Sequence, residues 1–147
     1  MKLLARALGN WLPATVLTVA GVAKLLNPGP FVQTLHWFGL SDTPAIIGGY
    51  AIPSVELGMA AALMVLGSRR WAICGAIGMF LTFSLALVYM LSSNDPPACN
   101  CLGALRLFSD ARRELLFGLA RNLLVLGAMV WALAEWCPAE RRIAPVV

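Results

Sequence analysis

The stretch Trp71–Leu91, WAICGAIGMFLTFSLALVYML, decides the fold class, because it runs for 21 residues without a charged side chain. At a rise of about 1.5 Å per residue, a helix of this length crosses a hydrocarbon layer about 30 Å thick. Its apolar residues do not alternate with polar ones, as they would in a strand of a membrane barrel. The stretch therefore predicts a transmembrane helix.

Three more apolar segments of similar length lie at about residues 7–26, 45–66 and 115–136. The chain of 147 residues is 60% hydrophobic and only 12% charged, which is more apolar than a soluble domain of this size needs. We predict an all-α integral membrane four-helix bundle that forms a single domain over residues 1–147. The sequence contains no nucleic-acid motif.

The distribution of basic residues predicts the orientation. Four spans place both termini on one side of the membrane, and an excess of Lys and Arg marks the cytoplasmic side. The termini and the middle loop carry six basic residues, namely Lys2, Arg6, Arg69, Arg70, Arg141 and Arg142. We therefore expect cytoplasmic termini in a bacterial inner membrane, and a periplasmic loop between the third and fourth spans.

That loop contains the pair Cys99 and Cys101, separated by one residue. A disulfide between them would close a very small ring, and strained, exposed disulfides are the reducible ones. A helix beginning near residue 102 would place both thiols at its N-terminus, which favours the reactive thiolate. The first interpretation is an exchange-active dithiol; the alternatives are a soft-metal site for Cu(I), Zn or Hg, and structural or inert cysteines.

Four polar residues fall inside the predicted spans: Lys24, Glu56, Arg121 and Asn122. Ionisable groups at such depth are costly and are usually paired or functional. Glu56 with Arg121 is the most economical pairing, whereas Lys24 either reaches inwards or extends to the surface. The group is either an ion-pair clamp between helices, or a proton-handling or quinone-binding site beneath the cysteines.

Three further residues carry weaker signals. His36 lies in the apolar segment 27–43, which we expect at the membrane interface, and it is either a surface histidine or a proton carrier near the thiols. Cys74 and Cys137 are both expected near the cytoplasmic level, where independent thiols are the simpler interpretation and a pair is the alternative.

Four short motifs occur together, in the order Gly21-x-x-Lys24, Pro53-x-x-Glu56-Leu57, Cys99-x-Cys101-x-Gly103 and Arg121-Asn122. Their order and spacing resemble the methylamine-utilisation MauE family, within the broader DoxX-like group of four-helix membrane proteins. The resemblance extends from about residue 8 to 134. One departure is Leu102, where the family usually has phenylalanine.

The resemblance implies a redox-associated role in maturation of the disulfide-rich methylamine dehydrogenase light subunit, together with a periplasmic thioredoxin-like partner. We expect Cys99 and Cys101 to be the catalytic pair, with the four intramembrane polar residues as a supporting cluster. No metal-ligating residue is assigned and no cofactor is established by the sequence, with a quinone as the candidate cofactor. The alternatives are a non-catalytic subunit or anchor of a larger, quinone-linked redox complex, and a soft-metal carrier.

Overall fold

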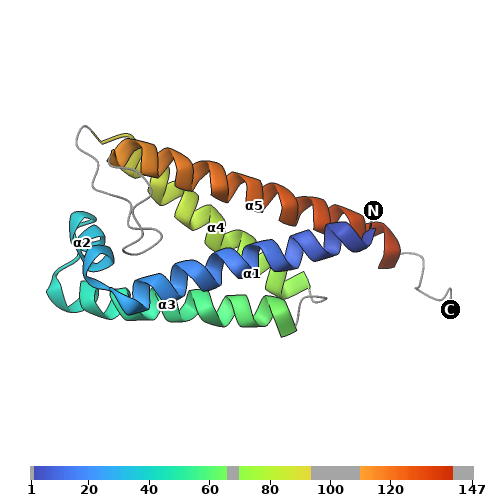
Figure 1. Cartoon of the computed structure of the whole chain (residues 1–147), viewed down its shortest axis with the longest axis horizontal. Helices are drawn as coiled ribbons and strands as arrows, with labels where there is room; N and C mark the ends of the chain where they lie inside the picture. Colours follow the sequence, from blue (N-terminus) through green and yellow to red (C-terminus); the bar gives the residue numbers. More distant parts are fainter. Residues whose placement is uncertain (1, 66–69, 94–109, 141–147) are drawn as a thin grey trace.

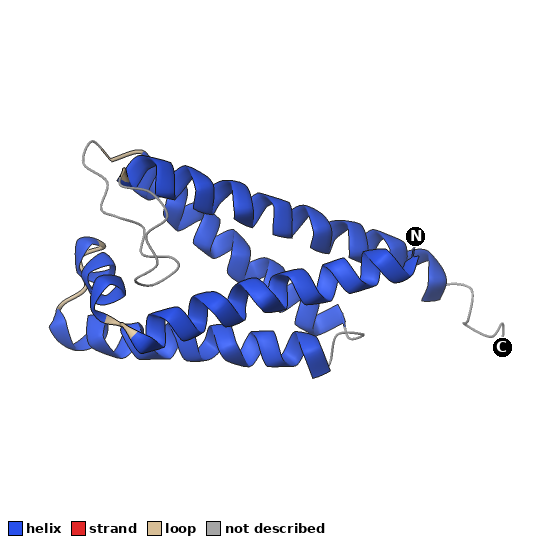
Figure 2. Ribbon diagram, in the orientation of Figure 1, coloured by secondary structure: helices blue, strands red, loops and turns tan. Residues whose placement is uncertain are grey.

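The computed structural model describes residues 2–65, 70–93 and 110–140. These residues form five helices, namely α1 (Lys2–Leu26), α2 (Gly29–Trp37), α3 (Asp42–Val65), α4 (Arg70–Leu91) and α5 (Ala111–Glu140) (Figure 1). Within the described ranges all regular structure is helical, as Figure 2 shows, which confirms the all-α prediction.

The four long helices pack lengthwise. α1 makes extensive contacts with α3 and α5, α4 packs mainly on α5, and α2 rests on α3. The start of α1 and the end of α5 lie at one end of the molecule (Figure 1). The opposite end holds α2, the end of α4 and the start of α5 (Figure 1). The bundle therefore has two distinct ends, and α4 ends and α5 begins at the end that carries α2 (Figure 1).

Three helices, α3, α4 and α5, are each long and apolar enough to cross a membrane. A fourth candidate is the pair α1 and α2, which meets the same criterion only jointly and is bent by 97° between the two helices. Asn10 and Lys24 make α1 less apolar than the other long helices. The described residues thus belong to a membrane protein and provide three helices able to span the bilayer, or four if the bent pair counts as one.

The short helix α2 was not predicted as a helix. The sequence Pro28-Gly29-Pro30 suggests a turn, but a proline in the first helical turn fits the helix because that turn needs no N–H donor there. α2 ends before Gly39, whose φ of +88° turns the chain and whose N–H donates to the His36 carbonyl at 2.8 Å. The predicted apolar segment is therefore a helix bent sharply away from α1.

The helix α5 extends four residues beyond its predicted start and four beyond its predicted end. At its start, the Asp110 carboxylate accepts a hydrogen bond from the N–H of Arg112 at 3.0 Å, which satisfies a donor in the first turn. Charged residues such as Arg113 and Glu114 continue the helix outside the apolar run. Hydropathy alone therefore found the span but not the full helix.

The main core lies between α1, α3, α4 and α5 and is centred on Leu17, Leu63, Ile73, Phe80 and Met129, each at most 1% exposed. Many other large apolar side chains point outwards, as expected for a surface that faces lipid. Lipid tails are as apolar as leucine, so helix association here depends on close packing and polar contacts rather than on hydrophobic burial. This makes the buried polar groups important for the fold as well as for the site.

Candidate functional site

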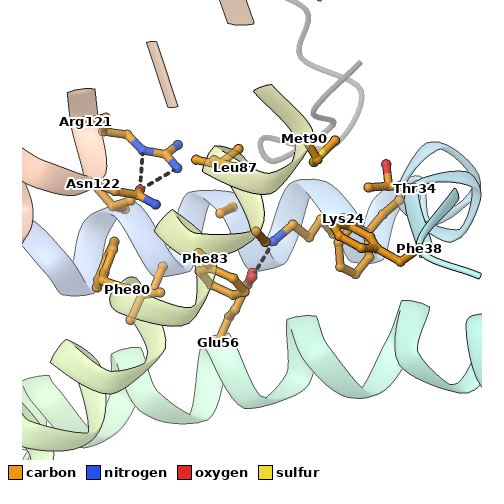
Figure 3. Close-up of a pocket in the computed structure, with 15 residues that line it drawn as sticks. Lys24, Thr34, Phe38, Glu56, Phe80, Phe83, Leu87, Met90, Arg121 and Asn122 are labelled. Carbon is orange, nitrogen blue, oxygen red and sulfur yellow. Dashed lines mark hydrogen bonds and ion pairs between the residues drawn. The ribbon is translucent and has the colours of Figure 1, made fainter. Parts of the chain in front are cut away.

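A buried ion pair joins α1 to α3 near the centre of the site. Lys24 Nζ donates to Glu56 Oε1, and the two side chains are 4% and 0% exposed (Figure 3). The expected pairing of Glu56 with Arg121 is therefore wrong, and Lys24 reaches inwards instead of extending to the surface. Depth along a helix can be read from sequence, but the direction in which each side chain points cannot.

Close packing of α1 on α3 explains this pairing. A Cβ atom placed on Gly21 would lie 3.0 Å from Leu57 Cγ and 3.1 Å from the Pro53 carbonyl oxygen. Residues three positions apart share a helix face, so Lys24 follows Gly21 on α1 as Glu56 follows Pro53 on α3. Two of the motifs in the sequence are thus the two sides of one helix–helix contact.

Gly21→Ala is expected to lower the free energy of unfolding by about 1–3 kcal/mol, because the new methyl group meets a backbone oxygen that cannot easily move away. Denaturant unfolding in detergent, followed by circular dichroism, measures this change. The matched control is Gly58→Ala on α3, where a Cβ meets nothing within 4 Å. Equal stability of both variants would show that the contact at Gly21 does not limit the approach of α1 to α3.

The Lys24 ammonium also lies against two aromatic rings. Nζ is 4.8 Å from the centroid of Phe31 on α2 and 5.1 Å from that of Phe83 on α4. A cation over a ring face is stabilised by the ring's quadrupole, more strongly where water is excluded. Through one carboxylate and two rings, Lys24 connects α1 with α2, α3 and α4.

Two polar residues of α5 face the same region. Arg121 donates from Nη2 to Asn122 Oδ1 at 3.1 Å, with a longer contact from Nε at 3.4 Å, and Asn122 is 1% exposed (Figure 3). Among the described residues, no carboxylate lies within ion-pair distance of Arg121. Lys24, Glu56 and Arg121 together therefore carry a formal net charge of +1.

A partly enclosed cavity of about 70 Å³ brings these groups together. The four intramembrane polar residues predicted from sequence all line it, as do Thr34 and Phe38 from the α2 region (Figure 3). The remaining wall is apolar and includes Leu17, Phe80, Phe83, Leu87 and Met90. The four residues of the predicted polar cluster therefore line one cavity.

Three buried polar atoms at this site have no hydrogen-bond partner among the described residues. Glu56 Oε2 is an acceptor, whereas Arg121 Nη1 and Asn122 Nδ2 are donors. An unmade hydrogen bond is costly in an apolar environment, so groups of this kind are normally satisfied by water or by a ligand. The site is thus built to receive both an acceptor and a donor.

A comparison with known protein families gives a match over most of the chain. A family model described as methylamine utilisation protein MauE matches residues 1–135. The chain belongs to the MauE family. No curated protein and no solved structure matches the chain significantly. As a MauE family member, it is a membrane protein involved in methylamine utilisation.

The structure describes only some of the cysteines of this MauE protein. Cys99, Cys101 and the region of the expected short helix after them lie outside the described residues, as does the side chain of Cys137. Cys74 is exposed on α4 and forms no disulfide. Among the described residues, no group of three His, Cys, Asp or Glu side chains could hold a metal ion.

An aromatic group beside the cavity was missed by the sequence analysis. Trp37 and Phe38 at the end of α2 contact Tyr89 near the end of α4, with all three ring-centroid distances between 5.1 and 5.9 Å. His36 lies next to this group and donates from Nδ1 to the Leu40 carbonyl at 3.0 Å. In this MauE family member, the aromatic contacts hold α2 near α4 at the end of the bundle where the α4–α5 connection begins.

Proposed function

We propose that this MauE family member is a thiol–disulfide redox protein of the bacterial inner membrane. Cys99 and Cys101 exchange with a periplasmic thioredoxin-like partner that serves the disulfide-rich subunit of methylamine dehydrogenase. Family membership supports the pathway, and the spacing of the two cysteines supports the chemistry. The proposed orientation has cytoplasmic termini and follows from the basic residues at the termini and in the α3–α4 connection.

The observation that carries this proposal is the position of the polar cavity along the bundle. Met90, in the last turn of α4, lines the cavity, and Arg121 lies about three turns into α5. The segment 94–109, which contains both cysteines, joins the end of α4 to the start of α5. The buried charges therefore occupy the half of the bundle to which the cysteine-containing segment is attached.

The proposed thiol–disulfide exchange takes place in two steps. When the cysteine pair is reduced, one thiolate attacks the partner's disulfide and forms a mixed disulfide. The second thiolate then attacks the sulfur of its neighbour, so a disulfide closes in this protein and the partner leaves as a dithiol. Two electrons pass from this protein to its partner, and the same steps in reverse pass them back.

Trapping of the mixed disulfide tests this proposal. Cys101→Ser is expected to hold a partner covalently through Cys99, or Cys99→Ser through Cys101, because the resolving thiol is then absent. Non-reducing electrophoresis of membranes should show a larger species that disappears with dithiothreitol and contains a thioredoxin-like protein by mass spectrometry. Cys74→Ser, which changes an exposed thiol on α4, is the matched control and should trap nothing. Absence of an adduct in both single variants would contradict the proposal.

A further inference from the structure

We propose that the cavity between α1, α3, α4 and α5 binds the ring of a lipid-soluble quinone, with Arg121 and Asn122 as donors to a ring oxygen and Glu56 as the acceptor for the reduced form. This inference rests on the proposed function and extends it. Closing a dithiol to a disulfide releases two electrons and two protons, and a quinone that takes up both becomes a quinol. The reverse reaction returns them to the disulfide.

The unpartnered atoms determine which polar groups an occupant must present. Arg121 Nη1 and Asn122 Nδ2 require an acceptor, and Glu56 Oε2 requires a donor. A quinone carbonyl oxygen accepts hydrogen bonds, and the hydroxyl group of the corresponding quinol donates one. The formal charge of +1 at the site favours an electron-rich oxygen over a cation. The two redox forms of a single ring compound therefore satisfy both requirements.

The cavity wall determines the rest of the occupant. Apart from the charged pair and the α5 residues, the wall is formed mainly by apolar and aromatic side chains, among them Leu17, Phe80, Phe83 and Leu87. A buried water needs about 10–15 Å³, so a cavity of about 70 Å³ exceeds what one water fills. Apolar walls with a few convergent polar groups are typical of small-molecule sites. A flat, apolar ring with polar oxygens fits this wall.

A fatty acid is the main competing occupant that a membrane can supply. Its carboxylate would accept hydrogen bonds from Arg121 and Asn122 as a quinone does. Unlike a quinol, however, it would offer no donor to Glu56 Oε2 when ionised, and it would bring a second negative charge towards that carboxylate. The arrangement of donors and acceptor at the site therefore favours the ring compound in its reduced form.

Binding of duroquinone to the purified protein in detergent micelles tests the inference by calorimetric titration. Its ring is fully substituted, so thiols cannot add to it. We expect saturable binding to the wild type that Arg121→Met and Asn122→Leu each weaken about tenfold, since each removes a donor to the ring oxygen. Thr82→Val, on the exposed face of α4, removes a hydroxyl outside the cavity and should leave affinity unchanged.

A second variant keeps the test decisive if the α5 substitutions impair folding. Ala86 is a half-buried residue of the cavity wall, and Ala86→Phe should abolish binding by filling the space while all four polar residues remain. Absence of saturable binding to the wild type, unchanged affinity in Ala86→Phe, or displacement of duroquinone by an equal concentration of oleate would each overturn the inference.

The Cys99→Ser/Cys101→Ser variant separates this inference from the proposed function. It should bind duroquinone as the wild type does, because the cavity residues are unchanged. Normal binding together with failure of the wild type to form a mixed disulfide would contradict the proposed thiol exchange and still support the quinone site. Loss of binding in this double variant would contradict the assignment of the site to the cavity.

Discussion

Glu56→Leu is expected to lower the free energy of unfolding by about 3–5 kcal/mol, because it leaves the Lys24 ammonium buried without its carboxylate. The rings of Phe31 and Phe83 would still face the amine, but they supply only part of the lost stabilisation. Lys24→Met should cost a similar amount, because it leaves the Glu56 carboxylate without a counter-charge. Denaturant unfolding of the detergent-solubilised protein measures both changes.

The double variant Lys24→Met/Glu56→Leu makes this prediction specific to the ion pair. Two apolar side chains of similar size remove both charges, so the stability should return to within about 1 kcal/mol of the wild type. Ser54→Ala on the exposed face of α3 is the control and should change little. A double variant as unstable as the sum of the two single variants would show that the charges do not act as a pair.

The second large effect is expected on function. In a methylamine-utilising host that lacks its own copy, Cys99→Ser/Cys101→Ser should abolish growth that depends on methylamine. The reason is that neither half of the thiol exchange can occur without the two sulfur atoms. The unfolding transition of the purified variant should match that of the wild type, since the buried polar cluster and the core are unchanged.

This result would also separate the proposed function from the alternative of a non-catalytic subunit or anchor. An anchor would support normal growth without the two cysteines and would purify in fixed stoichiometry with a larger enzyme. Cys74→Ser provides the control for the loss of a thiol as such, because Cys74 is exposed on α4 and lies outside the cavity. Normal growth of the double variant would therefore contradict thiol exchange.

The sequence predicted the long helices because a membrane-spanning helix requires a long apolar run that is easily recognised. An uncharged run such as Trp71–Leu91 has few alternatives to a span. It did not predict α2, because Pro28 and Pro30 suggest a turn although proline also suits a helix start. The first turn of α5 was missed because its charged residues lie outside the apolar run by which the span was recognised.

The sequence predicted which residues form the candidate site, but it did not predict which of them contact one another. Depth along the spans indicated that Lys24, Glu56 and Arg121 share one half of the membrane. The choice of Lys24 over Arg121 as the partner of Glu56 depends on how closely α1 packs on α3, which a single glycine, Gly21, permits. The aromatic group of Trp37, Phe38 and Tyr89 depends on the bend between α1 and α2, which the sequence did not reveal.

The redox state of the pair Cys99 and Cys101 in living cells tests the central claim most directly. In a background with Cys74→Ala and Cys137→Ala, only this pair reacts with a maleimide of high mass, and each free thiol adds one step to the gel mobility. Thiol exchange predicts both the oxidised and the reduced form, in proportions that change when the periplasmic partner is deleted. A pair that stays in one state in all these cells would contradict it.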